Sequence, residues 1–279
     1  MALRKLIASA GVALATLGAA AAQDAAPASL RADPFSALVG KRKPAAERAI
    51  ATSAVERFVV ATDDRVFLFQ SDDRAGRLKF LCGDSDRRID CAIDEIAPAE
   101  EIHLVTPSRA SRGDIIWRNA EGEMLLRVAA YGGVTIFWPG EARGQAASKS
   151  FGEDPALALD PADLATARRR AQRATALVSA RTGAPIVFDI GEPDADADGG
   201  ARVLADAVVR AAKGVSAVAD DPTGARVIAA RLKRVAFEIG RPPDVFVRKD
   251  ALVVIYDPTA DIHGRPSSAR IERLLEDAL

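Results

Sequence analysis

The sharpest chemical pattern in the sequence is a run of alternating carboxylates. Asp194, Asp196 and Asp198 are each separated by one alanine, and Gly199 follows at once. Oxygen ligands at alternate positions, followed by a glycine that turns the chain, are typical of the front of a calcium-binding loop. The twelfth position of such a loop should be glutamate, but Ala205 stands there. We favour the interpretation that Asp198 or Gly199 caps the following helix, and an ion site stays open as the alternative.

The chain has two cysteines, Cys82 and Cys91. Apolar residues on either side of the polar stretch Gly83–Arg88 predict two short strands joined by a turn, and this hairpin would bring the thiols together. In an oxidising compartment such a pair forms a disulfide. The alternative is a redox pair, which usually has closely spaced cysteines at the start of a helix. We therefore predict a structural Cys82–Cys91 disulfide.

The two histidines, His103 and His263, give little support to a catalytic or metal site. Zinc needs several His or Cys ligands, and the cysteines are expected to be paired, so we predict no metal centre. The segment Asp261–Ser268 holds an acid, a histidine and hydroxyls, but the sequence contains no Gly-x-Ser-x-Gly turn to expose a serine. It also contains neither of the glycine-rich phosphate-binding motifs. We predict no cofactor and assign no catalytic residues.

Two further patterns are basic. Arg168–Arg170 with Arg173 form a positive stripe that could meet an anionic glycan or a lipid headgroup, although a solvated helix face is the favoured interpretation. Arg112, Gly113 and Asp114 spell a cell-adhesion tripeptide, but a turn that leads into the next strand explains them fully.

The elements that must position these residues change in character along the chain. Residues 57–139 contain short, alternating apolar segments about ten residues apart, which predicts a small antiparallel β-sandwich or barrel with Trp117 and Trp138 in its core. Residues 140–159 are rich in glycine and poor in large apolar residues, so we expect a linker there.

Residues 160–279 alternate between helical and strand periodicities. Asp160 and Pro161 predict the start of a long helix that ends at Gly183. Further helices and about four alternating segments follow, which indicates an antiparallel sheet covered by helices and an α+β fold for the chain as a whole. Residues 228–239 fit either periodicity, so the switch from helix to strand near Arg234 is open.

The start of the sequence predicts export. Arg4 and Lys5 precede an apolar stretch, and small residues end at Ala22, as in a secretory signal peptide that is cleaved before Gln23. A membrane anchor is the alternative, but the stretch is mostly alanine and glycine. We expect 1–22 to be the signal peptide, 23–56 to be a leader, and the mature chain to have no transmembrane span. The chain has 38 Lys and Arg against 39 Asp and Glu, and this near balance argues against nucleic acid as a partner.

Four segments together resemble a known family. They are Thr106–Trp117, Leu125–Val128, Tyr131–Phe137 and the tail from Leu252 through Ser268. They are similar to an alpha-proteobacterial family of exported proteins classed as a domain of unknown function. The resemblance implies export and supplies no catalytic residues to carry over.

The sequence therefore favours a periplasmic or secreted envelope protein with a non-catalytic binding or assembly role, its partner an unidentified envelope component. The alternative is a hydrolase that acts on an envelope polymer through a pair of carboxyl groups, since such a pair leaves no local signature in a sequence. Two carboxyl groups that face each other across one cleft, about 5–9 Å apart, with a raised pKa on one of them, would favour the enzyme, and the lack of such a pair would favour the binding protein.

Overall fold

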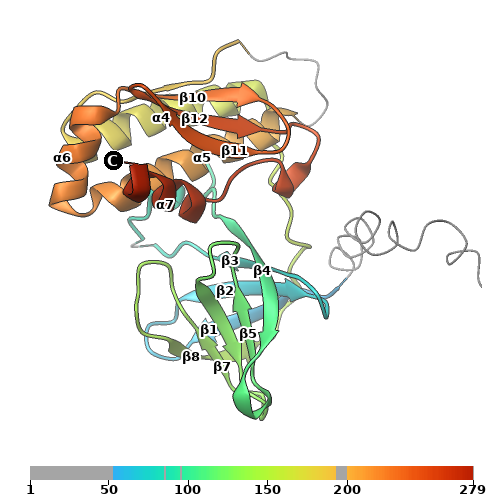
Figure 1. Ribbon diagram of the computed structural model, residues 1–279. Coiled ribbons are helices and arrows are strands. Elements are labelled where there is room, and N and C mark those ends of the chain that lie inside the picture. The colour runs from blue at the N-terminus through green and yellow to red at the C-terminus, as the bar shows by residue number, and fades with distance from the viewer. Residues whose placement is uncertain (1–52, 85, 95, 193–199, 279) are drawn as a thin grey trace, which may run out of the picture. The chain divides into compact units, whose positions relative to one another are not determined.

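The computed structural model describes residues 53–84, 86–94, 96–192 and 200–278. A closed eight-stranded barrel is followed by a four-stranded sheet with helices packed against it (Figure 1). This confirms the predicted α+β fold, and the β-rich first half is a barrel rather than a sandwich. The expected signal peptide and nearly all of the expected leader lie outside the described residues.

The barrel strands follow one another around the ring in chain order, and each is antiparallel to its neighbours. They are β1 (Glu56–Val60), β2 (Val66–Ser71), β3 (Gly76–Phe80), β4 (Ile102–Arg109), β5 (Ile115–Arg118), β6 (Met124–Val128), β7 (Val134–Ile136) and β8 (Gln145–Ser150). β8 pairs with β1 as well as with β7, and this second pairing closes the barrel. Closure leaves no unpaired strand edge in the barrel.

Aromatic side chains fill much of the barrel interior. The ring of Trp117 meets Phe69 edge-on at 5.0 Å between centroids, and that of Trp138 lies 4.6 Å from Phe80. Both tryptophans are 5% exposed. The prediction that they belong to a small β core is therefore confirmed, because large rings at alternate strand positions fill the space inside a narrow barrel.

Strand β8 lies inside the stretch that we expected to be a linker, 140–159. Its residues are polar or small, and none is fully buried. It is a strand because its backbone hydrogen-bonds to two neighbouring strands, and hydrophobic periodicity cannot detect such a segment. The chain leaves the barrel after Ser150, and the next residue, Phe151, is fully exposed.

The segment that carries the cysteines is not a hairpin, contrary to our prediction. Cys82 follows β3, whereas Cys91 lies on α3 (Ile89–Ala92), a single helical turn. The predicted disulfide is present, with the two Cα atoms 5.7 Å apart. Ile89 is buried in the cluster that surrounds helix α5 (Gly200–Ala219), and this contact holds the segment as a helical turn.

The second sheet has the strand order β11-β12-β10-β9 and is mixed, so the antiparallel sheet that we predicted is wrong. Its strands are β9 (Val187–Asp189), β10 (Arg234–Ile239), β11 (Asp244–Arg248) and β12 (Ala251–Tyr256). β10 is parallel to both β9 and β12, and only β11 and β12 pair antiparallel. The helices between β9 and β10 allow the chain to return in the same direction, and β12 inserts between β11 and β10.

Three further helices accompany α5. They are α4 (Leu164–Thr182), α6 (Pro222–Arg231) and α7 (Ser268–Ala278). Helix α4 is capped by Asp163, whose side chain accepts from the Thr166 N–H at 2.8 Å, and not by Asp160 as we predicted. The predicted end at Gly183 is confirmed, and its φ of 72° is the left-handed conformation that glycine adopts easily. The open switch near Arg234 resolves as a strand, because α6 ends before it.

Two hydrophobic clusters support these elements. One fills the barrel, and the other surrounds α5 and also includes Leu68, Ile89 and Ile102 from the first half of the chain. Helices α5 and α7 approach closely at Gly214, where a Cβ atom would lie 2.7 Å from the Ser268 carbonyl oxygen. Glycine is therefore required for this helix contact.

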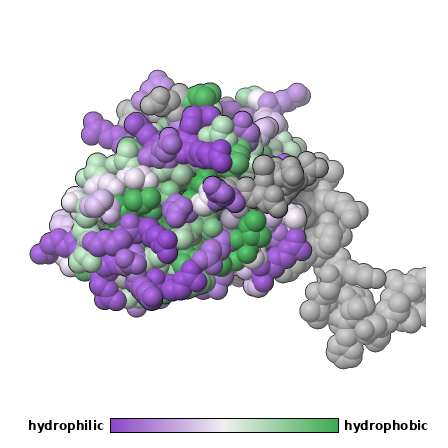
Figure 2. Space-filling view, turned by 90° about the horizontal axis from the view of Figure 1, so that it is seen from above, coloured by the Kyte–Doolittle hydropathy of each residue, from purple (hydrophilic) through white to green (hydrophobic). Residues whose placement is uncertain are grey.

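The face seen in Figure 2 mixes hydrophilic side chains with smaller apolar areas. In the described part of the chain, no helix combines the length and the hydrophobicity of a membrane span.

Candidate functional site

Helix α5 is largely apolar, but it carries three buried or nearly buried charged side chains on one face, in addition to the partly exposed Arg202. Asp206, Arg210 and Lys213 follow the spacing i, i+4, i+7, which places them on one side of the helix. Arg210 is completely buried, and the Lys213 side chain is 13% exposed. Alanine and valine, most of them fully buried, make up much of the rest of the helix. Charges in such surroundings need partners from other elements.

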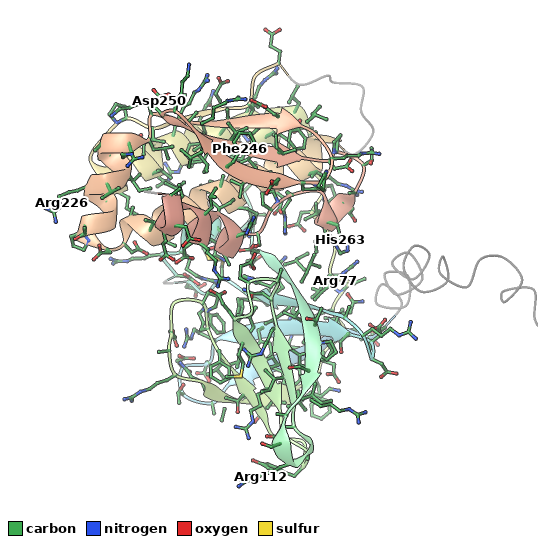
Figure 3. The ribbon with its side chains drawn as sticks, viewed as in Figure 1. Arg77, Arg112, Arg226, Phe246, Asp250 and His263 are labelled. Carbon is green, nitrogen blue, oxygen red and sulfur yellow. A yellow bond between two sulfur atoms is a disulfide. The ribbon has the colours of Figure 1, made fainter. Side chains whose placement is uncertain are left out.

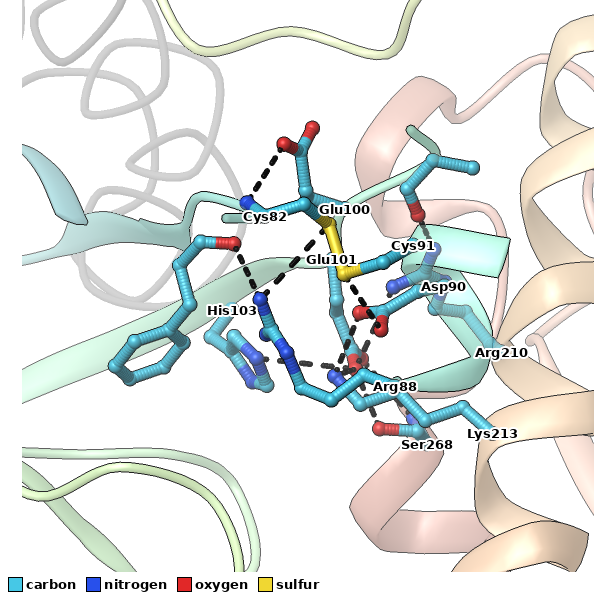
Figure 4. A network of polar contacts seen from close by, with 12 residues as sticks. Cys82, Arg88, Asp90, Cys91, Glu100, Glu101, His103, Arg210, Lys213 and Ser268 are labelled. Atoms are coloured by element: carbon cyan, nitrogen blue, oxygen red, sulfur yellow. Dashed lines mark hydrogen bonds and ion pairs between the residues drawn. A yellow bond between two sulfur atoms is a disulfide. The ribbon is translucent and has the colours of Figure 1, made fainter. Parts of the chain in front are cut away.

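Glu101, directly before β4, supplies the central partner. Its Oε2 atom lies 3.1 Å from Lys213 Nζ and 3.5 Å from a guanidinium nitrogen of Arg210 (Figure 4). Its Oε1 atom accepts the backbone N–H of Ser268 at 3.0 Å, and the Ser268 hydroxyl donates to Oε2. Because Ser268 is the first residue of α7, the carboxylate also lies at a helix N-terminus, where a negative charge is favoured.

Two more carboxylates complete a buried ion network. Asp90 on α3 is fully buried and lies 3.0 Å from Lys213 Nζ. Asp206 lies 2.5 Å from Arg265 and 3.4 Å from Arg210. The network therefore ties the segment before β4 to α5 and to the start of α7.

The charges in the network determine which groups are ionised. Burial opposes ionisation of Glu101, but the surrounding cations more than offset it and hold the pKa of this carboxyl well below its usual range. The pKa of Asp90 is lowered against burial in the same way, chiefly by Lys213 and Arg210. Both carboxyls are therefore ionised at neutral pH.

His103 on β4 behaves differently. Burial lowers its pKa to about 4, so the imidazole is neutral at physiological pH. Its Nε2 atom lies 3.8 Å from Glu101 Oε2 and has no hydrogen-bond partner among the described residues. The Ser268 hydroxyl, which lines the same cleft as His103, donates to Glu101 and not to the imidazole. These side chains therefore form a structural network and not a nucleophile paired with a base.

A cleft of about 720 Å³ opens beside the network, and we call it the α5–α7 cleft. Helices α5 and α7 line it together with three barrel segments and with single residues from α3 and α4. Six polar or aromatic side chains of the lining enter the argument below. They are Lys213 and Ser216 of α5, Ser268 and Glu272 of α7, and Glu123 and Trp138 of the barrel. Its size is in the range that holds a small-molecule ligand.

Several polar groups that line the α5–α7 cleft lack a hydrogen-bond partner among the described residues: Nε2 of His103, Nη1 of Arg88, and the side chains of Ser216 and Glu272. The last two bear most directly on ligand binding. Glu272 makes no hydrogen bond or ion pair with another residue of the described chain, and Ser216, which is 2% exposed, has a buried hydroxyl with no hydrogen bond there. Burial raises the pKa of Glu272 to about 7, and the negative charges of Glu276 and Glu123 add to the effect. Unpartnered polar groups in a cleft indicate a place for an external partner.

The cations of the cleft, by contrast, are already neutralised. Arg88 lies 2.7 Å from Asp86, and Arg181 lies 3.2 Å from Asp220. Lys213 is held by its two buried carboxylates. The charge left over in the α5–α7 cleft is therefore negative.

The structure places the sequence-derived candidates as follows. Both sulfurs of Cys82 and Cys91 are in the disulfide, so their proximity to Asp86 provides no thiolate ligands for a metal ion. His263 is exposed in a 3-10 turn, Asp261–His263, whereas His103 is buried. The candidate ion loop, Asp194, Asp196 and Asp198, lies outside the described residues.

The four arginines of the positive stripe on α4 do not share one environment. Arg168, Arg169 and Arg173 are exposed on α4, but Arg170 is buried and pairs with Asp94 at 3.0 Å, so the stripe is only partly a solvated face.

The Arg112-Gly113-Asp114 tripeptide forms a turn at the end of the barrel, with Arg112 labelled in Figure 3. Asp114 is buried and accepts hydrogen bonds from Arg127 and from the Ala130 N–H, as expected of a structural turn.

Sequence reasoning missed the residues that define this site: Glu101, Arg210, Lys213 and Glu272. One signal could have found two of them. Charged residues at i and i+3 in a stretch of alanine and valine would be buried with the helix, and buried charges need partners. No comparable signal marks Glu272, which occupies a polar position of an amphipathic helix.

The fold and site define an α+β protein in which a closed antiparallel barrel is joined by buried ion pairs to a helix-covered mixed sheet. A family model described as a domain of unknown function, DUF4908, matches residues 34–275, and the chain belongs to this family. Neither the curated proteins nor the solved structures contain a significant match.

Proposed function

We propose that this protein is an exported, non-catalytic binding protein of the cell envelope, and that it holds its ligand in the α5–α7 cleft. The observation that carries the proposal is the cleft itself, with the unpartnered groups of Glu272 and Ser216 in its lining. A rigid frame supports these groups, because the buried ion pairs fix α5 against the start of α7. Preorganised polar groups in a preformed cleft are typical of binding sites.

A non-catalytic role agrees with the bonding of the nearest hydroxyl and imidazole. Ser268 donates to Glu101, and His103 is neutral and buried. An activated serine would instead need its hydroxyl against a base that can take its proton.

Export rests on the signal-like start of the sequence and agrees with the disulfide, since disulfides persist in oxidising compartments. The periplasm is the proposed location. Fractionation and the mass of the mature protein test this: we expect periplasmic protein that begins at Gln23, and cytoplasmic protein that retains Met1 would contradict it.

A carboxylate-based hydrolase acting on an envelope polymer is the second candidate, and one observation favours it. Glu272 and Glu123 line the same cleft, and the pKa of Glu272 is raised to about 7. A carboxyl that is protonated near neutral pH can act as a general acid while a second carboxylate remains ionised.

A fragment screen followed by NMR of the mature protein tests the binding proposal. We expect the amide shifts caused by bound fragments to cluster at Lys213–Ala217 and Ser268–Glu272. Fragments that bind only elsewhere, or none that bind, would contradict it.

Purified peptidoglycan distinguishes the two candidates. The binding proposal predicts no release of soluble fragments from it. Release that falls by roughly a hundredfold or more in Glu272→Gln, but not in Glu276→Gln, would favour the hydrolase.

A further inference from the structure

The charges of the α5–α7 cleft indicate what kind of ligand it accepts. Each cation in its lining already has a carboxylate partner within the protein. Glu272 has no partner among the described residues, and Glu123 is hydrogen-bonded only to Asn119, which is neutral. An anionic ligand would meet this excess of negative charge without a free cation to bind it.

The site also has groups that accept hydrogen bonds. Ser216 presents a buried hydroxyl without a partner, and a hydroxyl oxygen can accept as well as donate. Glu272 and Glu123 supply carboxylate oxygens from α7 and from the barrel, respectively. A group with several N–H donors and a positive charge matches all three.

We propose that the α5–α7 cleft binds a ligand through a primary ammonium group, with the Glu272 carboxylate as its counter-ion and with Glu123 and the Ser216 hydroxyl as further acceptors. This inference rests on the proposed binding function and narrows it to one ligand chemistry. Aliphatic amines and amino sugars both carry such a group. An ammonium has three donors and no acceptor, so three oxygens are enough to satisfy it completely.

Proton linkage follows from this arrangement. The ammonium binds the ionised form of Glu272, whereas about half of the groups are protonated at neutral pH because the pKa is raised to about 7. For an aliphatic amine, which stays protonated throughout, binding at pH 7 releases about half a proton per site, and affinity rises by roughly tenfold from pH 6 to pH 8. For an amino sugar the rise is smaller, because its own ammonium begins to lose its proton at about pH 8.

Calorimetric titration of the mature protein tests the inference with two matched pairs of probes. The first pair is 1,5-diaminopentane and 1,5-pentanediol, and the second is glucosamine and N-acetylglucosamine. We expect one amine of the two pairs to bind, its neutral analogue to bind at least roughly tenfold more weakly, and the binding enthalpy to depend on the buffer as a proton is released. Which amine binds distinguishes an aliphatic amine from an amino sugar.

Two variants locate the effect. Glu272→Gln should lower the affinity for the amine by roughly tenfold and abolish the proton release. Glu276→Gln removes the same charge one turn further along α7, and it should change the affinity by no more than roughly twofold. Thermal unfolding confirms that both variants are folded.

The outcomes separate the inference from the function on which it rests. Two results would overturn the ammonium assignment. One is that no amine binds at 20 mM, about the weakest binding that such a titration detects. The other is that an amine binds the Glu272→Gln variant as tightly as it binds the wild type. A neutral analogue that binds in the cleft as tightly as its amine would overturn it too, but would leave the binding function intact. Fragments that avoid the cleft altogether would overturn both.

Discussion

Glu101 and Arg210 face each other in the protein interior, with Oε2 3.5 Å from a guanidinium nitrogen and with side chains that are 1% and 0% exposed. Glu101 precedes a barrel strand and Arg210 lies on α5, so this pair joins the two halves of the chain. The same carboxylate also holds Lys213 and the first residue of α7. The integrity of the α5–α7 cleft should therefore depend on this one buried side chain.

We expect Glu101→Gln to lower the free energy of unfolding by about 3 kcal/mol, because two buried cations lose their shared counter-charge. Urea unfolding measures the change. The matched control is Glu238→Gln, which breaks the exposed pair of Glu238 with Arg248 and should cost about 1 kcal/mol or less. Equal losses of unfolding free energy in the two variants would show that the buried ion pairs stabilise the protein no more than an exposed pair does.

Buried, neutral His103 should make a contribution to stability that is lost in mild acid. Its pKa is about 4 in the folded state and about 6.5 when unfolded, so between these values only the unfolded chain takes up the proton. The contribution of His103 to the free energy of unfolding should decrease by about 2 kcal/mol as the pH falls from 6.5 to 4.5, and the contribution of Glu272 changes in the opposite direction over this range.

Unfolding of His103→Gln and of the wild type across this pH range isolates the effect, since the variant should lose about 2 kcal/mol less stability than the wild type between pH 6.5 and pH 4.5. His263→Gln is the control, because His263 is exposed. A wild-type slope that survives in His103→Gln would assign the acid sensitivity to other groups.

Glu272 should show the opposite pH dependence. Its pKa is raised to about 7 by burial and by the negative charges of Glu276, Glu123 and Asp220, while Lys213 opposes them. The folded protein therefore holds a proton between pH 4.5 and pH 7 that the unfolded chain releases, and this contribution to stability is lost as the pH rises through 7. Above pH 7 the free energy of unfolding of Glu272→Gln should be higher than that of the wild type by about 1 kcal/mol, after allowance for solvent screening.

Carbon-detected NMR of the glutamate carboxyls measures the pKa directly. Glu276→Gln should shift the Glu272 titration to lower pH, because it removes one of the charges that raise it. A Glu272 carboxyl that titrates near pH 4.5 in the wild type would contradict the prediction.

Reduction of the Cys82–Cys91 disulfide should destabilise the protein by about 2–3 kcal/mol, the value expected for a loop of this length. The loop ends on α3, which carries Asp90, so its release also loosens the contact of Asp90 with Lys213. Unfolding of Cys82→Ser/Cys91→Ser measures the loss. Thiol titration of the unreduced mature protein should find no free thiol, and full reactivity before reduction would disprove the bond in the mature protein.

The boundary between residues 57–139 and residues 160–279 is still a proposal. A trypsin cut at Lys149 would fall inside β8 of the barrel, where the backbone is hydrogen-bonded. Phe151 follows that strand directly and is fully exposed, so we expect cleavage there. Brief chymotrypsin digestion should cut there and give two resistant fragments that elute together, because buried ion pairs join them.

A Phe151→Ser variant, which lacks the preferred chymotrypsin site, is the control and should resist this cut. Rapid degradation of either fragment after cleavage would show that the two halves depend on one shared core.

The amino-acid sequence by itself determined the local features. Alternating apolar residues predicted the barrel strands, and Gly183 predicted the end of α4. The two cysteines predicted the disulfide. All three features depend on interactions within a few residues of the chain, namely side-chain periodicity, backbone freedom and covalent chemistry. It could not predict β8, which is a strand only through its neighbours, or the parallel pairing of β10.

The candidate site was decided by the tertiary structure alone. Glu101, Arg210 and Glu272 come from separate parts of the chain, and only Arg210 stands out in its own segment, as a charge within an apolar helix. Only packing brings Glu101 to Arg210 and leaves Glu272 in a cleft with no partner among the residues that the structure describes. Burial then sets their charges, lowering the pKa of one carboxyl and raising that of the other, because the electrostatic energy of a group depends on what surrounds it in space.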